Sequence, residues 1–316
     1  MPDSTKPAPD LAFTASEEEA GERLDKLVLA ALTDFDYDYS RAQVQTMIKD
    51  GLITVDESLV KAGVKLRGTE TVRIWLPVEP QVELKPEVID LNVIYEDSEI
   101  AVINKPAGMV IHPGAGVASG TLVNGLLARY PEIAQMQDDE LRHGIVHRLD
   151  KDTSGLIVIA RNDLALEDLM AQFQERTVEK TYLTLVEREP KTVTGRIDAP
   201  IGRDPKQRKR MAVVRDGRPA ITEFKVLDTN FRDGQALVEL NLLTGRTHQI
   251  RVHMAFIGAP VVGDKVYGFR KQRIGMKRNF LHAAKLAFDH PQTTDRMTFE
   301  TPLPVGLQNI LDKLRT

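Results

Sequence analysis

A charged segment flanked by two apolar runs, near the middle of the chain, most limits the folds that this sequence can adopt. Residues 147–155 carry two aspartates, an arginine, a lysine and a histidine, whereas residues 144–146 and 156–159 are apolar. Ionised side chains are rarely buried unless they are paired. A charged turn between two buried strands is therefore either a structural clasp or an active site, and Asp150 is the residue that we expect to carry the chemistry.

The composition is that of an ordinary globular protein, with 42% hydrophobic and 28% charged residues in a chain of 316. The chain has no cysteine, which excludes disulfides, thiolate nucleophiles and cysteine-bound zinc. We find no apolar run of membrane-spanning length and no secretory signal at the start, so we expect a cytoplasmic protein that does not enter a membrane. The sequence has neither metal-ligand spacing nor a nucleotide-binding loop, so we expect no metal and no cofactor.

Strand patterns dominate the sequence after residue 90 and often follow one another without an intervening helix. That order predicts an α+β fold with a mainly antiparallel sheet, not a doubly wound parallel one. We expect strands at residues 93–96, 100–104, 156–161, 181–187, 221–228, 236–243 and 281–288, and helices at residues 122–130, 164–176, 247–257 and 305–314.

The first 80 residues show a different pattern, with two short amphipathic helices followed by strands. Apolar residues fall on one helical face in residues 23–32, and Ser40 with Gln43 fits a capping box for a second helix. Asp50 and Gly51 end that helix, and strand patterns follow. We therefore expect a disordered tail at residues 1–20, a small domain at 21–80, a proline-containing linker at 81–90 and a large domain at 91–316.

Two clusters of basic residues contrast with the formal net charge of −4. One spans residues 203–218 and includes Arg208 and Lys209, and the other spans residues 270–278. Clustered lysines and arginines near an active site favour contacts with the phosphate backbone of a nucleic acid. A solvated loop has the same composition, and the sequence alone leaves both interpretations open.

Five motifs, in order along about two-thirds of the chain, resemble those of the Rlu-type pseudouridine synthases. The charged segment is similar to the family's catalytic signature HRLDxxTSG, and the likeness is strongest to the RluD branch. The other motifs are residues 104–108 with His112 and Pro113, residues 179–183, residues 244–253, and residues 281–283 with His290 and Pro291.

This resemblance implies an isomerase that converts specific uridines of structured RNA to pseudouridine. The expected substrate is large-subunit (23S) ribosomal RNA, free or within the large subunit or its precursor, and the expected state is a monomer. The reaction moves the ribose bond from N1 to C5 of uracil, so no cofactor is needed. The first 80 residues resemble the S4 RNA-binding module, in which Arg41 and Lys49 are candidate RNA contacts, although Asp56 and Glu57 make this copy acidic.

The resemblance gives the central catalytic role to Asp150, which acts on the ribose as a nucleophile at C1′ or as a base at C2′. Both routes stay open, and both need an ionised carboxylate, which a nearby cation stabilises. The resemblance assigns that cation to Arg246. A purely structural ion pair of Asp150 and Arg246 is the alternative. Asp152 is expected to cap the turn instead.

Three further residues are expected around the target nucleotide. The resemblance implies that Tyr182 stacks on the flipped uracil and takes a proton from C5, and that Arg148 fills the space that the base leaves. Lys180 should share the strand face of Tyr182 and contact Asp150 or the RNA backbone. We interpret four histidines as structural rather than catalytic: His112, His147, His282 and His290.

Two rival functions remain. The first is a catalytically inactive RNA-binding or ribosome-assembly factor, which the complete set of Asp150, Tyr182 and Arg246 disfavours. The second is a hydrolase that uses Asp150 with His147, which requires a histidine placed to activate water.

Overall fold

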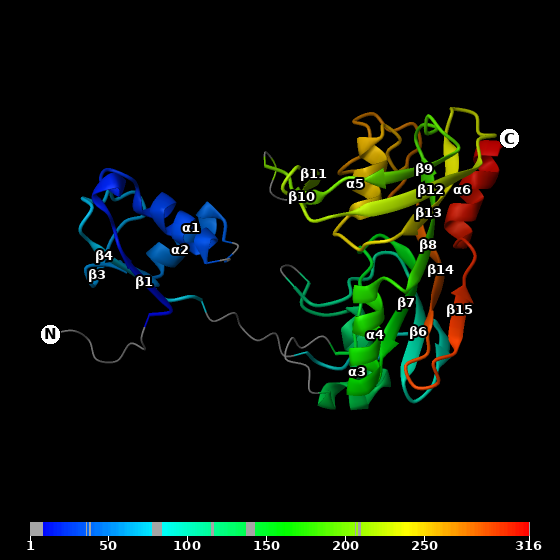
Figure 1. The fold of residues 1–316 in the computed structure, drawn as a ribbon, viewed down its shortest axis with the longest axis horizontal. Helices are drawn as coiled ribbons and strands as arrows, with labels where there is room; N and C mark the ends of the chain where they lie inside the picture. Colours follow the sequence, from blue (N-terminus) through cyan, green and yellow to red (C-terminus); the bar gives the residue numbers. More distant parts are fainter. Residues whose placement is uncertain are drawn as a thin grey trace. The chain divides into compact units, whose positions relative to one another are not determined.

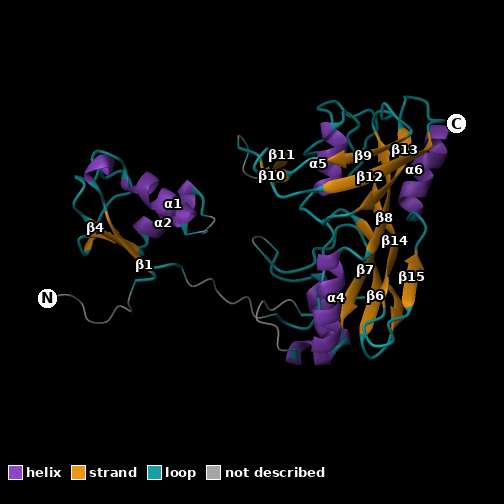
Figure 2. Cartoon of the chain, in the orientation of Figure 1, coloured by secondary structure: helices purple, strands orange, loops and turns teal. Residues whose placement is uncertain are grey.

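The computed structural model describes residues 9–35, 37, 39–77, 84–114, 117–136, 143–205, 207 and 210–315. The chain forms two compact units, Met1–Gln81 and Val82–Thr316 (Figure 1). Strands make up much of the larger unit, and helices lie outside them (Figure 2). Across the described residues, no helix has the length and apolar composition needed to cross a membrane.

The N-terminal unit combines two helices and a four-stranded antiparallel sheet in one core. Ser40 starts the second helix through the expected capping box, because its hydroxyl accepts the Gln43 N–H while the Gln43 side chain accepts the Ser40 N–H. The helices are α1 (Leu24–Asp34) and α2 (Arg41–Lys49), and the sheet order is β1-β4-β2-β3. Its strands are β1 (Leu11–Thr14), β2 (Ile53–Val55), β3 (Ser58–Leu59) and β4 (Thr71–Ile74), and a 3-10 turn, η1, covers Glu17–Glu19.

The expected disordered tail at residues 1–20 is wrong from residue 11 onward. Strand β1 pairs with β4 in antiparallel register, and Leu11 and Phe13 pack against the core of the unit. A four-residue edge strand gives little periodicity by itself, so its pairing with β4 is what orders it. Residues 1–8 lie outside the described residues.

The larger unit is built on a nine-stranded mixed sheet, which confirms the α+β class. The strand order is β5-β6-β7-β14-β8-β13-β12-β9, and β15 also pairs with β14. Among the described strands, β7 and β14 form the one parallel pair. The bounds are β5 (Val93–Glu96), β6 (Ile100–Lys105), β7 (Ser154–Ala160), β8 (Glu179–Val186), β9 (Thr194–Asp198), β12 (Ile221–Asp228), β13 (Ala236–Leu242), β14 (Leu281–Asp289) and β15 (Arg296–Glu300).

Helices cover both faces of this sheet (Figure 1). Alternate residues of β6 enter different cores, because successive strand residues point to opposite faces. Helices α3 (Leu122–Arg129) and α5 (Gln249–Phe256) pack on one face, and α4 (Asp163–Glu175) packs on the other. The remaining elements are α6 (Val305–Arg315), a 3-10 turn η2 (Pro131–Gln135), and the hairpin of β10 (Ile201–Arg203) and β11 (Met211–Val213).

The sheet opens between β7 and β14, and the charged segment enters at this opening. Strand β14 pairs with β7 over only two residues, and from Lys285 onward β14 pairs with β15 instead. Beyond this point β7 pairs with the residues just before the charged segment, since Ile145 bridges Ile159. Gly155 has φ +120, and a Cβ there would lie 2.2 Å from the Ala283 carbonyl oxygen. Only glycine allows this close approach, so Gly155 sets where the opening begins.

The sequence predicted the helices α3, α4, α5 and α6 and the strands β5, β6, β7, β8, β12, β13 and β14, with ends within two residues of those observed. It missed the strands β9, β10, β11 and β15, which are short and mostly exposed or half-buried. The described part of the expected linker is also packed: Glu87 N–H donates to Asn124 O, and Asn124 Nδ2 donates to Lys85 O. Residues 84–90 therefore lie against α3, and residues 81–83 are outside the described residues.

Candidate active site

The turn that carries Asp150 is tied to the preceding loop by the buried side chain of Lys105. Burial lowers the pKa of Lys105 to about 8, and the charges of Asp150 and Asp152 oppose that decrease. The ammonium donates to three backbone carbonyl oxygens, those of Pro106 (2.9 Å), Met109 (2.9 Å) and Lys151 (3.3 Å). Lys105 therefore joins residues 106–109 to the Asp150 turn.

Asp150 forms a charged pair with Arg251 of α5. Nη1 of Arg251 lies 3.0 Å from Oδ2 of Asp150, and the two side chains are 9% and 19% exposed. Arg251 is held from behind by the fully buried Asp264, which accepts from Nε at 2.7 Å and from Nη2 at 3.1 Å. Burial would lower the pKa of Arg251, but the bonds and charge of Asp264 and the charge of Asp150 raise it, so the guanidinium stays charged.

Arg246 does not make the ion pair that the sequence assigned to it. Its Nε donates to the Pro219 carbonyl oxygen at 3.1 Å, and its backbone N–H donates to Gln249. Arg246 precedes α5, whereas Arg251 lies within it on a buried part of the helix. Helix geometry explains the difference. Both arginines belong to the motif at residues 244–253, but only Arg251 lies within α5, where its side chain contacts Asp150.

His248 is a second residue that faces Asp150. Its Nε2 lies 3.9 Å from Oδ2 of Asp150, and its Nδ1 lies 2.8 Å from the hydroxyl of Tyr267. Sequence reasoning gave no role to His248, Arg251, Asp264 or Tyr267. The helix expected at residues 247–257 carries Arg251 and could have pointed to it, whereas His248 only precedes α5, with a left-handed backbone. A single sequence holds no signal that brings Asp264 and Tyr267 to the site.

Tyr182 lies on β8 within the core that also contains Leu149, the neighbour of Asp150. Burial, with a smaller contribution from the charge of Asp150, raises the pKa of Tyr182 above its ordinary value. The hydroxyl is therefore protonated near neutral pH. It can accept a proton only if it donates its own proton to another group at the same time.

Lys180 lies against α4 instead of meeting Asp150. Its ammonium donates to Val178 O at 3.1 Å and lies 5.2 Å from the centre of the Phe173 ring. Burial lowers its pKa to about 8. Within the described residues, the predicted contact with Asp150 is replaced by these two contacts.

The remaining predicted RNA contacts are spread over the chain. Arg148 is exposed beside Asp150. Arg41 donates two hydrogen bonds to the buried carboxylate of Asp25, and Lys49 is exposed in the last turn of α2. Arg208 and Lys209, which fall between β10 and β11, lie outside the described residues.

His147 has a structural position that removes the hydrolase interpretation. Its Nε2 accepts the Val158 N–H of β7 at 3.0 Å, and its ring stacks on Phe173. Burial, with a smaller contribution from Lys180, lowers the pKa of His147 to about 3. A neutral histidine whose acceptor nitrogen already binds a backbone N–H has no free acceptor nitrogen with which to activate water. His282 and His290 are likewise held, by Ser154 and Asp97 respectively.

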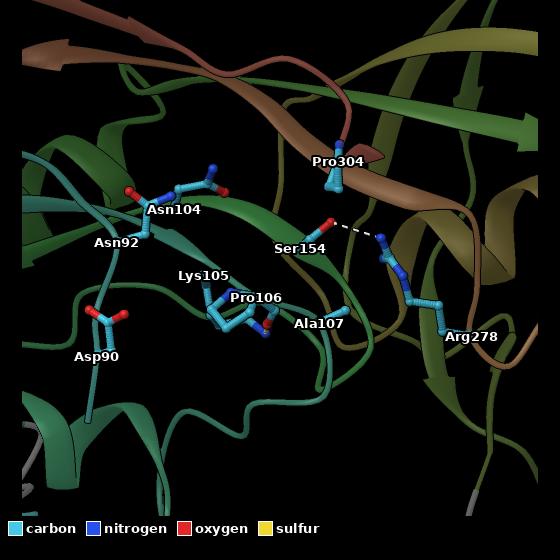
Figure 3. Close-up of a pocket in the computed structure, with 9 residues that line it drawn as sticks. All are labelled: Asp90, Asn92, Asn104, Lys105, Pro106, Ala107, Ser154, Arg278 and Pro304. Carbon is cyan, nitrogen blue, oxygen red and sulfur yellow. Dashed lines mark hydrogen bonds between the residues drawn. The ribbon is translucent and has the colours of Figure 1, made fainter. Parts of the chain in front are cut away.

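A cavity of about 350 Å³ adjoins the second half of the charged segment. Figure 3 shows Arg278 reaching Ser154, whose hydroxyl accepts a hydrogen bond from Nη2 at 3.2 Å, while Nη1 donates to Asp152 O at 3.0 Å. Arg278 therefore holds the turn at Asp152 and Ser154. The cavity is lined by Asp90, Asn92, Asn104, Lys105, Pro106, Ala107, Ser154, Arg278 and Pro304.

The site brings one carboxylate, a charged arginine and a buried tyrosine close together. Asp150 is held by a charged arginine and lies near a buried tyrosine, and an exposed arginine precedes it. No cluster of three potential metal ligands occurs in the described part of the chain. Asp150, Tyr182 and Arg148 are the residues that the resemblance to the pseudouridine synthases predicts here.

Comparison with known proteins agrees with that class. The family model for RNA pseudouridylate synthases matches residues 99–256, a range that contains both Asp150 and Arg251. The chain belongs to the RNA pseudouridylate synthase family, and it is an RNA pseudouridine synthase, an isomerase.

Two relatives match almost the whole chain. YlyB of Bacillus subtilis (strain 168), an uncharacterized RNA pseudouridine synthase, is 46% identical over 303 residues, covering 96% of this chain and 97% of that protein. Ribosomal large subunit pseudouridine synthase D of Vibrio vulnificus (strain CMCP6) is 39% identical over 319 residues, covering 97% and 95%. The solved structure of human RNA pseudouridylate synthase domain containing 1 has a TM-score of 0.56 at 28% identity, covering 73% of this chain and 96% of that one.

Proposed function

We propose that this enzyme isomerises specific uridines of large-subunit (23S) ribosomal RNA, with Asp150 as the catalytic carboxylate. The observation that carries the chemistry is the pair of Asp150 and Arg251. The substrate rests on the relatives named ribosomal large subunit pseudouridine synthase D, which align over nearly all of the chain. We also propose that the enzyme works as a monomer in the cytoplasm.

Asp150 starts the reaction at the ribose. The C1′–N1 bond breaks, the C1′–C5 bond forms, N1 gains a proton and C5 loses one, so the atoms balance without any added reagent. Within the described residues, both close contacts of the Asp150 carboxylate involve Oδ2. Oδ1 is therefore the oxygen placed to act on the sugar, either as a nucleophile at C1′ or as a base at C2′.

Tyr182 and Arg148 complete the proposed mechanism. The target base must leave its stack before Asp150 can reach the sugar. The exposed Arg148 then fills the vacated space, and Tyr182 stacks on the flipped uracil. Because its hydroxyl is protonated at neutral pH, Tyr182 accepts the C5 proton only as it gives up its own.

RNA binding away from the reacting base is assigned to three regions. The N-terminal unit resembles an S4 module, and we propose that Arg41 and Lys49 contact RNA phosphates there. The buried Asp25 holds both Arg23 and Arg41 through paired hydrogen bonds, so two half-exposed guanidinium groups are fixed at that surface. The basic hairpin with Arg208 and Lys209 and the turn at Arg246 are the other two proposed regions, with Lys180 as a further candidate.

Tritium release from RNA labelled at uridine C5 tests this proposal. The substrate is ribosomal RNA, free or in large subunits, from cells that lack the enzyme. Wild-type protein should release tritium and Asp150→Asn should release none while it binds RNA within a few-fold of wild type. Asp152→Asn is the matched control and should stay active, since Asp152 is exposed and its carbonyl oxygen, not its carboxylate, accepts the bond from Arg278. Absence of release by the wild type on both substrates contradicts the proposal.

A further inference from the structure

The hydrogen bonds around His248 favour one tautomer of its imidazole. Tyr267 accepts the Met211 N–H at 2.9 Å, and its hydroxyl lies 2.8 Å from Nδ1 of His248. Tyr267 can therefore give its own proton to Nδ1, which leaves the hydrogen of a neutral imidazole on Nε2. The facing carboxylate of Asp150 favours the same tautomer. Burial lowers the pKa of His248, and the charge of Asp150 opposes that decrease.

The backbone at His248 is held in an uncommon conformation to place this ring. Its φ is 58°, in the left-handed region that residues other than glycine seldom adopt. The ring meets Tyr267 edge-on, with 5.6 Å between ring centres, and Tyr267 also lies 5.0 Å from the guanidinium carbon of Arg251. Strained residues persist where the surrounding structure fixes them, and they concentrate at functional sites.

The donor at His248 Nε2 and the acceptor at Asp150 Oδ2 are 3.9 Å apart, too far for a direct hydrogen bond. A group that fits between them must accept from one and donate to the other. A hydroxyl does both with a single oxygen, and two ordinary bonds of about 2.8 Å span this separation. A uracil carbonyl only accepts, and it would face the negative oxygen of Asp150.

We propose that His248 is a substrate-binding residue whose Nε2–H donates to the 2′-hydroxyl of the target uridine, while that hydroxyl donates to Oδ2 of Asp150. This inference rests on the proposed action of Asp150 at the ribose. Arg251 and the 2′-hydroxyl together occupy Oδ2, so Oδ1 is directed at the sugar carbons. His248 then orients the ribose and selects an RNA nucleotide over a DNA nucleotide at the reacting position.

A double-mutant cycle, in which enzyme variants are combined with substrate variants, tests the contact between His248 and the 2′-hydroxyl. The substrate is a fragment of large-subunit RNA with C5-tritiated uridine at the mapped target, made with either ribose or 2′-deoxyribose at that nucleotide alone. Single-turnover tritium release is measured for wild type, His248→Leu and His248→Gln. With ribose, His248→Leu should be slower by about threefold to tenfold, the effect of one hydrogen bond between neutral groups. His248→Gln, which keeps a donor, should recover much of the rate.

The 2′-deoxy substrate gives the discriminating result. It should slow the wild type and remove most of the difference between wild type and His248→Leu, because the two groups are partners in one contact. If His248→Leu slows both substrates by the same factor, or neither, the assignment to the 2′-hydroxyl is wrong. These outcomes differ from failure of the proposed function, in which the wild type releases no tritium from the ribose substrate. Equal thermal unfolding of the variants confirms that the change is local.

Discussion

Arg251 Nη1 lies 3.0 Å from Oδ2 of Asp150, across 101 residues of sequence, and no other arginine in the described chain forms an ion pair with that carboxylate. Asp264 fixes Arg251 from the opposite side. Negative, positive and negative side chains therefore follow one another from the buried Asp264 through Arg251 to Asp150. The carboxylate therefore has one orientation before any substrate arrives, which is what electrostatic preorganisation requires.

Replacing Arg251 by glutamine should strongly slow catalysis, whereas Arg246→Gln should not. Loss of Arg251 frees the carboxylate of Asp150 and leaves the buried Asp264 unpaired, so we expect the single-turnover rate to fall at least about a hundredfold. Arg246 is half-buried and bonded to a carbonyl oxygen, so its loss should weaken RNA binding and leave the rate at saturating enzyme within a few-fold. The reverse pattern would show that Arg246 moves to Asp150 when RNA binds.

Asp264→Asn should show whether Asp264 positions Arg251 for catalysis or only stabilises the fold. The amide keeps an acceptor for the N–H groups of Val266 and Tyr267, which Asp264 Oδ1 now accepts. It loses the charge that pairs with Arg251, which should cost on the order of a few kcal/mol of unfolding free energy. Well below the melting temperature, the maximal rate should still fall while the KM for RNA stays near that of wild type. Full activity at that temperature would reduce Asp264 to a purely structural residue.

Tyr182→Phe should lose activity without a change in RNA affinity. Burial and the charge of Asp150 raise the pKa of this hydroxyl, so it carries its proton throughout the neutral range. The ratio of wild-type to Tyr182→Phe rates should therefore stay constant between about pH 6.5 and pH 9, with a value of about a hundred or more. A ratio that grows tenfold per pH unit in this window would mean that the tyrosinate is the reacting form.

His147→Gln should make the fold more resistant to acid. The pKa of His147 falls from 6.5 to about 3 on folding, so the unfolded chain binds more protons between these values. By linkage, its contribution to stability is complete above about pH 6.5 and is lost as the pH falls toward 3, on the order of a few kcal/mol in all. Glutamine can accept the Val158 N–H without titrating. Urea unfolding at about pH 7.5 and pH 4.5 should show that the variant loses less unfolding free energy between these pH values than the wild type does. The variant should still lose some, because the pKa of His282 is also lowered, to about 4.

The sequence by itself determined the helices and most strands of the larger unit and the α+β class, and it singled out Asp150 and Tyr182 as candidate site residues. Periodicity and capping are local properties, and the Asp150 motif is continuous in the chain, so both can be read without coordinates. The position of Ser40 before α2 was readable for the same reason.

Only the tertiary structure decided which residues meet Asp150. Arg246 and Arg251 are indistinguishable by type and lie in one motif, and the start of α5 between them sends only Arg251 inward. Asp264 and Tyr267 reach the site because the chain returns to it after α5, and strand β1 exists because β4 offers it a partner 60 residues later. Contacts between segments that lie far apart in the sequence depend on the tertiary fold, and no local pattern in the sequence records them.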